Sequence, residues 1–131
     1  MKGPTPKAIK LHKASRTLEL EYEADNYTLT AEYLRVFSPS AEVRGHSPEQ
    51  AKLQTNKMDV GINKLEPVGN YAIKIFFNDG HSTGIYPWTY LYELCVNQEE
   101  NWQDYLKRLD EAGASRDGAQ VVNIMDFSPK Q

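Results

Sequence analysis

Alternation of apolar and polar side chains predicts short β-strands in the first half of the chain. The clearest case is residues 17–23, where Leu18, Leu20 and Tyr22 alternate with three glutamates. A period of two is typical of a strand with one face on the core and the other in solvent. Shorter patterns of the same kind predict further strands at residues 8–12, 27–29 and 58–62.

Residues 66–94 are predicted to form the nucleus of the fold. A turn at 66–70 leads into alternating residues 71–77, and the Asp79-Gly80 dipeptide is typical of a two-residue hairpin turn before a returning strand at 82–86. Pro87 fits the first turn of a helix, where its missing N–H costs nothing. That helix carries one apolar face, made of Trp88, Leu91, Tyr92, Cys95 and Val96.

Two further helices follow from capping signals. Thr30 is predicted to cap a helix that ends before Pro39. Asn97, with Glu100 three residues later, resembles a capping box, and Gly113 is placed to end that last helix. Together the elements predict an α+β fold: a small, mostly antiparallel β-sheet with C-terminal helices packed on it.

The predicted elements form one domain over residues 1–113. Residues 114–131 are polar, contain Gly118 and Pro129, and are predicted to be a flexible tail. Residues 121–127 (VVNIMDF) are an apolar exception within it. They dock either on the sheet or on a partner, and the sequence does not decide between the two.

Composition limits the function more than the fold. The net charge of −3, with mixed signs, argues against nucleic acid as the main partner. No apolar run is long enough for a transmembrane span, and the N-terminus lacks the apolar segment of a secretory signal. The single cysteine, Cys95, cannot form an intrachain disulfide, which favours a reducing, cytoplasmic location.

Motifs for catalysis are missing, so neither enzyme activity nor a resident cofactor is predicted. No phosphate-binding glycine loop, His-x-x-x-His pair or nucleophile elbow occurs. The polar loop at 38–54 is the predicted place for binding, together with the turn at 78–81, and a plain solvated loop is the alternative. The residues assigned to this binding surface are Arg35, Ser38, Ser40, Arg44 and His46.

Three segments carry a resemblance to a known family. SRTLEL (15–20), EYLRVFSPSAEVRGH (32–46) and EPVGNYAIKIFFNDGHSTGIYPWTYLYEL (66–94) occur in the order typical of the gamma-butyrobetaine hydroxylase-like N-terminal domain, formerly a domain of unknown function. In two carnitine-pathway oxygenases such a domain precedes an iron- and 2-oxoglutarate-dependent catalytic domain. That domain needs far more chain than 131 residues, so the resemblance implies the accessory domain standing alone, without oxygenase activity.

The resemblance also implies a lost zinc site. In those oxygenases three cysteines and one histidine bind a structural zinc ion, and the matching positions here are Ser38, Ser40, Val43 and His81. A closed zinc site needs four ligands, and a serine hydroxyl is a poor substitute for a thiolate. His81 therefore either packs and hydrogen-bonds at the hairpin, or joins His46 in a weaker anion or metal site, where Asp79 would be the third ligand of a zinc or iron ion.

Similar domains are also fused to P-loop ATPases that carry iron–sulfur clusters. This association implies, by family analogy alone, a role near iron–sulfur or metal handling. The leading hypothesis is an accessory binding module with an unknown protein partner. The alternative is a metal-binding protein that uses His81 with His46.

Overall fold

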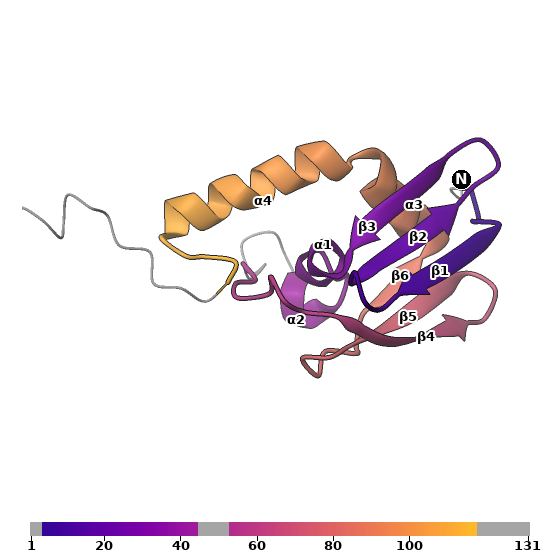
Figure 1. The fold of residues 1–131 in the computed structure, drawn as a ribbon, viewed down its shortest axis with the longest axis horizontal. Helices are drawn as coiled ribbons and strands as arrows, with labels where there is room; N and C mark the ends of the chain where they lie inside the picture. Colours follow the sequence, from indigo (N-terminus) through magenta and orange to yellow (C-terminus); the bar gives the residue numbers. More distant parts are fainter. Residues whose placement is uncertain (1–3, 45–52, 118–131) are drawn as a thin grey trace, which may run out of the picture.

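The computed structural model describes residues 4–44 and 53–117, which form two small antiparallel sheets and four helices (Figure 1). The first sheet has the order β1 (Ala8–His12), β2 (Thr17–Glu21), β3 (Asn26–Thr30). The second has the order β4 (Ile62–Val68), β5 (Ala72–Phe77), β6 (Ile85–Pro87). The helices are α1 (Ala31–Val36), α2 (Ala41–Arg44), α3 (Trp88–Val96) and α4 (Gln98–Ala112). The predicted α+β class is confirmed, although the strands are divided between two sheets.

The first sheet follows the alternation predicted from the sequence. In β2, Leu18 and Leu20 are fully buried, whereas Glu19 and Glu21 lie on the outer face. Glu21 pairs there with Lys10 at 2.7 Å and Glu19 with His12 at 3.0 Å, across the antiparallel β1–β2 ladder. Exposed pairs of this kind add little stability, so the inward leucines hold the sheet in place.

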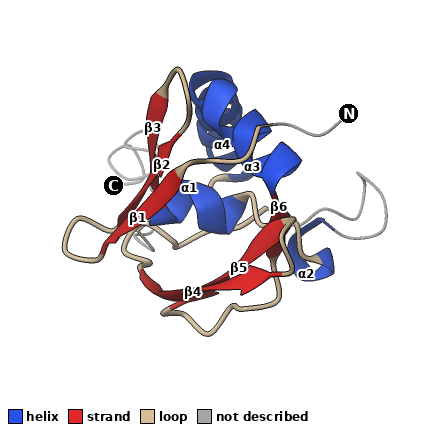
Figure 2. Cartoon of the chain, turned by 90° about the vertical axis from the view of Figure 1, so that its right-hand side faces the viewer, coloured by secondary structure: helices blue, strands red, loops and turns tan. Residues whose placement is uncertain are grey.

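Helix α1 lies between the two sheets and forms the centre of the core (Figure 2). Thr30 caps it as predicted, because the Thr30 hydroxyl accepts a hydrogen bond from the Tyr33 N–H at 3.0 Å. All six residues of the helix are buried, including two that carry charge. A helix this short is not stable by itself, so packing and long-range hydrogen bonds must hold it.

The strand predicted over 58–62 is wrong, and the turn predicted at 66–70 starts three residues too early. Strand β4 begins only at Ile62 and continues to Val68, with a turn at 69–71 that uses the positive φ of Gly69 (+53°). Residues before Ile62 form a turn instead, in which the Val60 N–H donates to the carbonyl of Lys57 at 3.1 Å. Pro67 is tolerated within β4 because this strand lies at the edge of its sheet.

The predicted two-residue hairpin at Asp79-Gly80 is also wrong. Gly80 has a positive φ (+93°) but Asp79 does not, and the Phe77 N–H donates to the carbonyl of His81 across a longer loop. The returning strand β6 starts at Ile85 rather than at residue 82. The chain leaves the ladder at 81–84 because His81 and Gly84 pack against Ser38.

The C-terminal helices form where they were predicted, with differences at their ends. Pro87 lies just before α3, at its N-cap position. Val96, predicted on the apolar face of this helix, is exposed, whereas Leu94 is buried. Asn97 makes no side-chain cap to α4, whereas Gly113 ends this helix with a φ of +66°, as predicted. No helix in the described ranges is long and apolar enough to cross a membrane.

The predicted tail begins too early at residue 114. The carbonyls of Ser115 and Arg116 accept hydrogen bonds from the N–H groups of Asn56 and Met58, at 3.1 and 2.9 Å. Residues 114–117 therefore belong to the folded part of the chain. Residues 118–131, and with them the apolar segment 121–127, lie outside the described residues.

Candidate functional site

Helix α1 carries two buried charged side chains, and each lies in a different polar cluster. Glu32 and Arg35 are 5% and 8% exposed, and each forms an ion pair with a side chain from another part of the chain. An uncompensated charge at this depth would be strongly destabilising. The partners of these two residues therefore define the two polar sites of the described structure.

Arg35 is neutralised by Asp79. The Arg35 Nε donates to Oδ2 of Asp79 at 2.9 Å, the Lys57 ammonium lies 2.6 Å from the same oxygen, and the Arg35 Nη1 donates to Gln54 at 3.0 Å. Burial raises the pKa of the Asp79 carboxyl, but hydrogen bonds from Lys57 and from the His81 N–H, together with the charges of Arg35 and Lys57, outweigh it. The net result is a pKa below the usual range.

Ser38 and His81 lie next to the Arg35–Asp79 ion pair, and together these residues form the Arg35 cluster. The Ser38 Oγ lies 2.8 Å from Nε2 of His81, and the Ser40 N–H donates to the same hydroxyl at 3.3 Å. A serine and a histidine at this distance could act as nucleophile and base. Ser38, however, is only 1% exposed, and Asp79 accepts a hydrogen bond from the backbone N–H of His81. The pair therefore ties the loop at 81–84 to the segment after α1.

The metal site considered from the sequence gains no support from this geometry. Two ligands of one tetrahedral zinc ion lie about 3.3 Å apart, further than the Ser38–His81 distance of 2.8 Å, which is typical of a shared hydrogen. Within residues 4–44 and 53–117, no three His, Cys, Asp or Glu side chains are grouped to hold a metal ion. Asp79 is committed to Arg35 and Lys57, and His46 lies outside the described residues.

The predicted binding surface is mostly interior. Arg35, Ser38 and Ser40 are 8%, 1% and 6% exposed, so only Arg44 of the described members reaches solvent. The Arg44 guanidinium lies 4.8 Å from the centre of the Tyr90 ring, and the Tyr90 hydroxyl donates to the carbonyl of Phe37 at 2.5 Å. Arg44 ends α2, a helix inside the region predicted as a loop.

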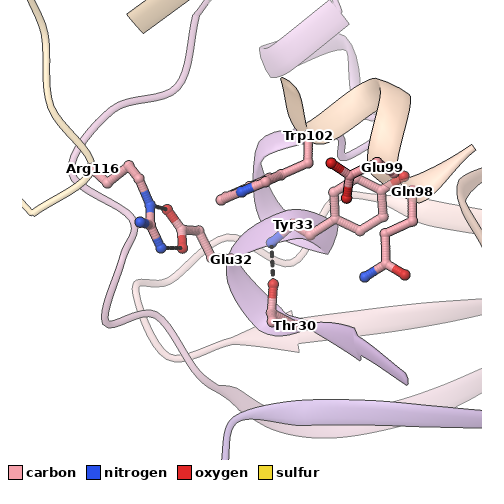
Figure 3. Close-up of a pocket in the computed structure, with 7 residues that line it drawn as sticks. All are labelled: Thr30, Glu32, Tyr33, Gln98, Glu99, Trp102 and Arg116. Carbon is pink, nitrogen blue, oxygen red and sulfur yellow. Dashed lines mark hydrogen bonds and ion pairs between the residues drawn. The ribbon is translucent and has the colours of Figure 1, made fainter. Parts of the chain in front are cut away.

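Glu32 belongs to a second polar site, which the sequence did not predict. Figure 3 shows the Arg116 guanidinium facing Glu32, with both Nε and Nη2 donating to its carboxylate at 2.8 Å. The same guanidinium lies 5.2 Å from the centre of the Trp102 indole. Beside this pair is a cavity of about 280 Å³, further lined by Thr30, Tyr33, Gln98 and Glu99 (Figure 3). No motif marks this site, because its members come from the end of β3, from α1, from α4 and from the segment after α4.

Comparison with known proteins gives a consistent family assignment. The family model described as "Gamma-butyrobetaine hydroxylase-like, N-terminal" matches residues 9–92, and no catalytic-domain family was found along the chain. Two proteins with NMR solution structures are similar: one has 52% identity and a TM-score of 0.81, covering 93% of this chain and 98% of that one. The other has 49% identity and a TM-score of 0.75, with 87% and 86% covered.

A more distant relative is described as a protein with unknown function. This relative is a DUF971-family protein from Acidithiobacillus ferrooxidans with a crystal structure. Its sequence is 36% identical to the present chain, and the two structures superpose with a TM-score of 0.57. The match covers 68% of this chain and 90% of that one. None of the curated proteins matches this chain.

Proposed function

The chain belongs to the gamma-butyrobetaine hydroxylase-like N-terminal domain family, and from that premise we propose that it is an accessory binding module without catalysis of its own. The observation that carries this proposal is that the polar side chains best suited to chemistry bind one another. Ser38 is hydrogen-bonded to His81, and Arg35 is paired with Asp79. A nucleophile or base must reach a substrate, and these buried groups serve instead to fix the loop at 81–84.

The surface we propose for partner binding is the exposed Arg44 stacked on Tyr90. The ring of Tyr90 is held in place by its hydrogen bond to Phe37, so it presents a fixed platform to the guanidinium. Arginine and tyrosine are among the residue types most enriched where proteins bind each other. By analogy with family members fused to iron–sulfur ATPases, the proposed partner is a cytoplasmic protein of iron–sulfur or metal handling.

The test is a comparison of captured partners between two charge reversals. Arg44→Glu reverses the proposed surface, and Lys107→Glu makes the same change on the exposed face of α4. A protein retained by the wild-type chain and by Lys107→Glu is expected to bind Arg44→Glu about tenfold more weakly or worse. Equal retention by all three chains would exclude this surface, and turnover of a carnitine-type substrate by the purified chain would exclude the proposal as a whole.

Elemental analysis separates this proposal from the metal-binding alternative. We expect the purified chain to contain well below one equivalent of zinc or iron, because Nε2 of His81 is hydrogen-bonded to the Ser38 hydroxyl. One retained equivalent, lost in His81→Ala and in His46→Ala, would favour metal binding instead.

A further inference from the structure

Glu32 is a buried carboxylate whose counter-charge comes from outside the core. Its side chain is 6% exposed, whereas that of Arg116 is 37% exposed. In the other ion pair of α1 the cation is the buried partner: Arg35 lies on the helix itself, and its side chain is 9% exposed. The cation that neutralises Glu32 therefore belongs to the segment that follows α4 in the chain.

The contacts of Arg116 are those of guanidinium recognition. Both hydrogen bonds to Glu32 are 2.8 Å long and form a parallel, bidentate pair. The guanidinium also lies over the Trp102 indole, the best aromatic face for a cation. A carboxylate in the core and a tryptophan on α4 thus define a socket that a neutral side chain would not satisfy.

The site also binds the main chain around Arg116. The carbonyls of Ser115 and Arg116 accept hydrogen bonds from the N–H groups of Asn56 and Met58, at 3.1 and 2.9 Å. These two donors point to a peptide as the ligand, because a free guanidine compound would leave them unused.

Space around the guanidinium is open on more than one side. Besides the cavity of about 280 Å³ in Figure 3, a second of about 180 Å³ is lined by Glu32 and Arg116 together with Arg16 and Met58. The larger cavity also contains the carboxylate of Glu99, so its charged lining consists of two carboxylates and one guanidinium. This excess of negative charge favours an entering cation over an anion.

We propose that Glu32 and Trp102 form an arginine-binding site, which Arg116 fills within the chain and which an arginine of a bound peptide fills when Arg116 withdraws. The site is separate from the Arg44–Tyr90 surface. Its test is therefore independent of the function proposed above.

The experiment supplies the native segment as a separate peptide. Acetyl-Ala-Ser-Arg-Asp-amide, which copies residues 114–117, is titrated into ¹⁵N-labelled Arg116→Ala protein. The 114–117 segment of this variant has lost its side-chain anchor, so the peptide can displace it from the N–H groups of Asn56 and Met58. The indole N–H of Trp102 is the reporter, and that of Trp88, bonded to the carbonyl of Asn70 at 2.9 Å, is the internal reference. We expect saturable shifts at Trp102 alone, with an affinity about tenfold above that of the wild-type chain, where Arg116 competes at high effective concentration.

Three controls make the result specific. The same peptide with citrulline, a neutral isostere of arginine, is expected to cause no saturable shift. Glu32→Gln in the Arg116→Ala background should abolish binding of the arginine peptide. Free arginine should bind more weakly than the peptide, and equal or tighter binding would replace the peptide with a small molecule as the ligand and refute the proposal as stated.

Two other outcomes would overturn the proposal: equal binding of the citrulline peptide, or no saturable shift with the arginine peptide. Loss of Arg116 leaves Glu32 without its charge partner, so the variant protein is open to unfolding. In that case the arginine peptide, but not the citrulline peptide, is expected to restore a dispersed amide spectrum. Failure to restore it would equally refute the proposal.

Discussion

Replacing Gly84 with alanine tests the contact that fixes the loop at 81–84. A Cβ at this position would overlap the Oγ of Ser38 and would lie 3.3 Å from Cε1 of Tyr86. The hydroxyl cannot easily move away, because Ser38 is 1% exposed and bonded to His81 at 2.8 Å. Overpacking of this kind costs about 1–3 kcal/mol of unfolding free energy.

The cost of Gly84→Ala should depend on the Ser38 hydroxyl. Ser38→Ala alone loses the hydrogen bond to His81, which is worth about 1 kcal/mol. In that background the overlapping oxygen is gone, so most of the penalty of Gly84→Ala should disappear. The double variant is therefore expected to be more stable than the sum of the single variants predicts, by about 1–2 kcal/mol.

The assay is chemical unfolding of the four chains at pH 7, followed by tryptophan fluorescence and circular dichroism. Gly113→Ala is the matched control, since its φ of +66° makes alanine strained while its Cβ would meet nothing within 4 Å. The effects of Gly113→Ala and Ser38→Ala should add within about 0.5 kcal/mol. If Gly84→Ala and Ser38→Ala were equally additive, the close contact between these positions would not exist in solution.

Three further predictions concern single groups. Because the folded pKa of Asp79 is lowered, its contribution to stability is complete above the unfolded value near 3.8 and is lost as the pH falls through the lower folded value. Asp79→Asn should therefore flatten the fall in unfolding free energy below about pH 4. Burial raises the pKa of the Cys95 thiol to about 11, so a disulfide reagent at pH 8 should label it only after unfolding. Finally, cysteines in place of three side chains should let His81 complete a site for one equivalent of zinc, detectable as a tetrahedral cobalt spectrum that His81→Ala removes. The replaced side chains are Ser38, Ser40 and Val43.

The parts of the fold predicted well are those that local pattern determines. The leucines and glutamates of β2 require two faces whatever lies beside them, and the caps at Thr30 and Gly113 depend only on residues within one helical turn. The failures lie where distant segments direct the backbone. Residues 56–58 bond to the carbonyls of 115–116 instead of forming a strand, and residues 81–84 turn toward Ser38.

The candidate sites divide in the same way. Family resemblance drew attention to Ser38 and His81, and the structure places them in contact. Glu32 lies in the first turn of α1, where an acidic residue is common, and the sequence alone does not show that this helix lacks a solvent face. Arg116 lay in a predicted tail, and only the three-dimensional arrangement brings it 2.8 Å from Glu32.

The charges of α1 are costly ways to stabilise a core, since an apolar side chain of similar volume usually serves as well as a buried ion pair. Their two partners nevertheless differ in a way that stability does not explain. Asp79 accepts hydrogen bonds from Arg35, from Lys57 and from a backbone N–H, so donors from three parts of the chain share that carboxylate. The Glu32 carboxylate accepts two hydrogen bonds from a single guanidinium, which is 37% exposed and borders open cavities. A carboxylate that is fixed in the core but paired with an accessible cation is organised for exchange, and this asymmetry is why we place the arginine-binding site at Glu32 and not at Arg35.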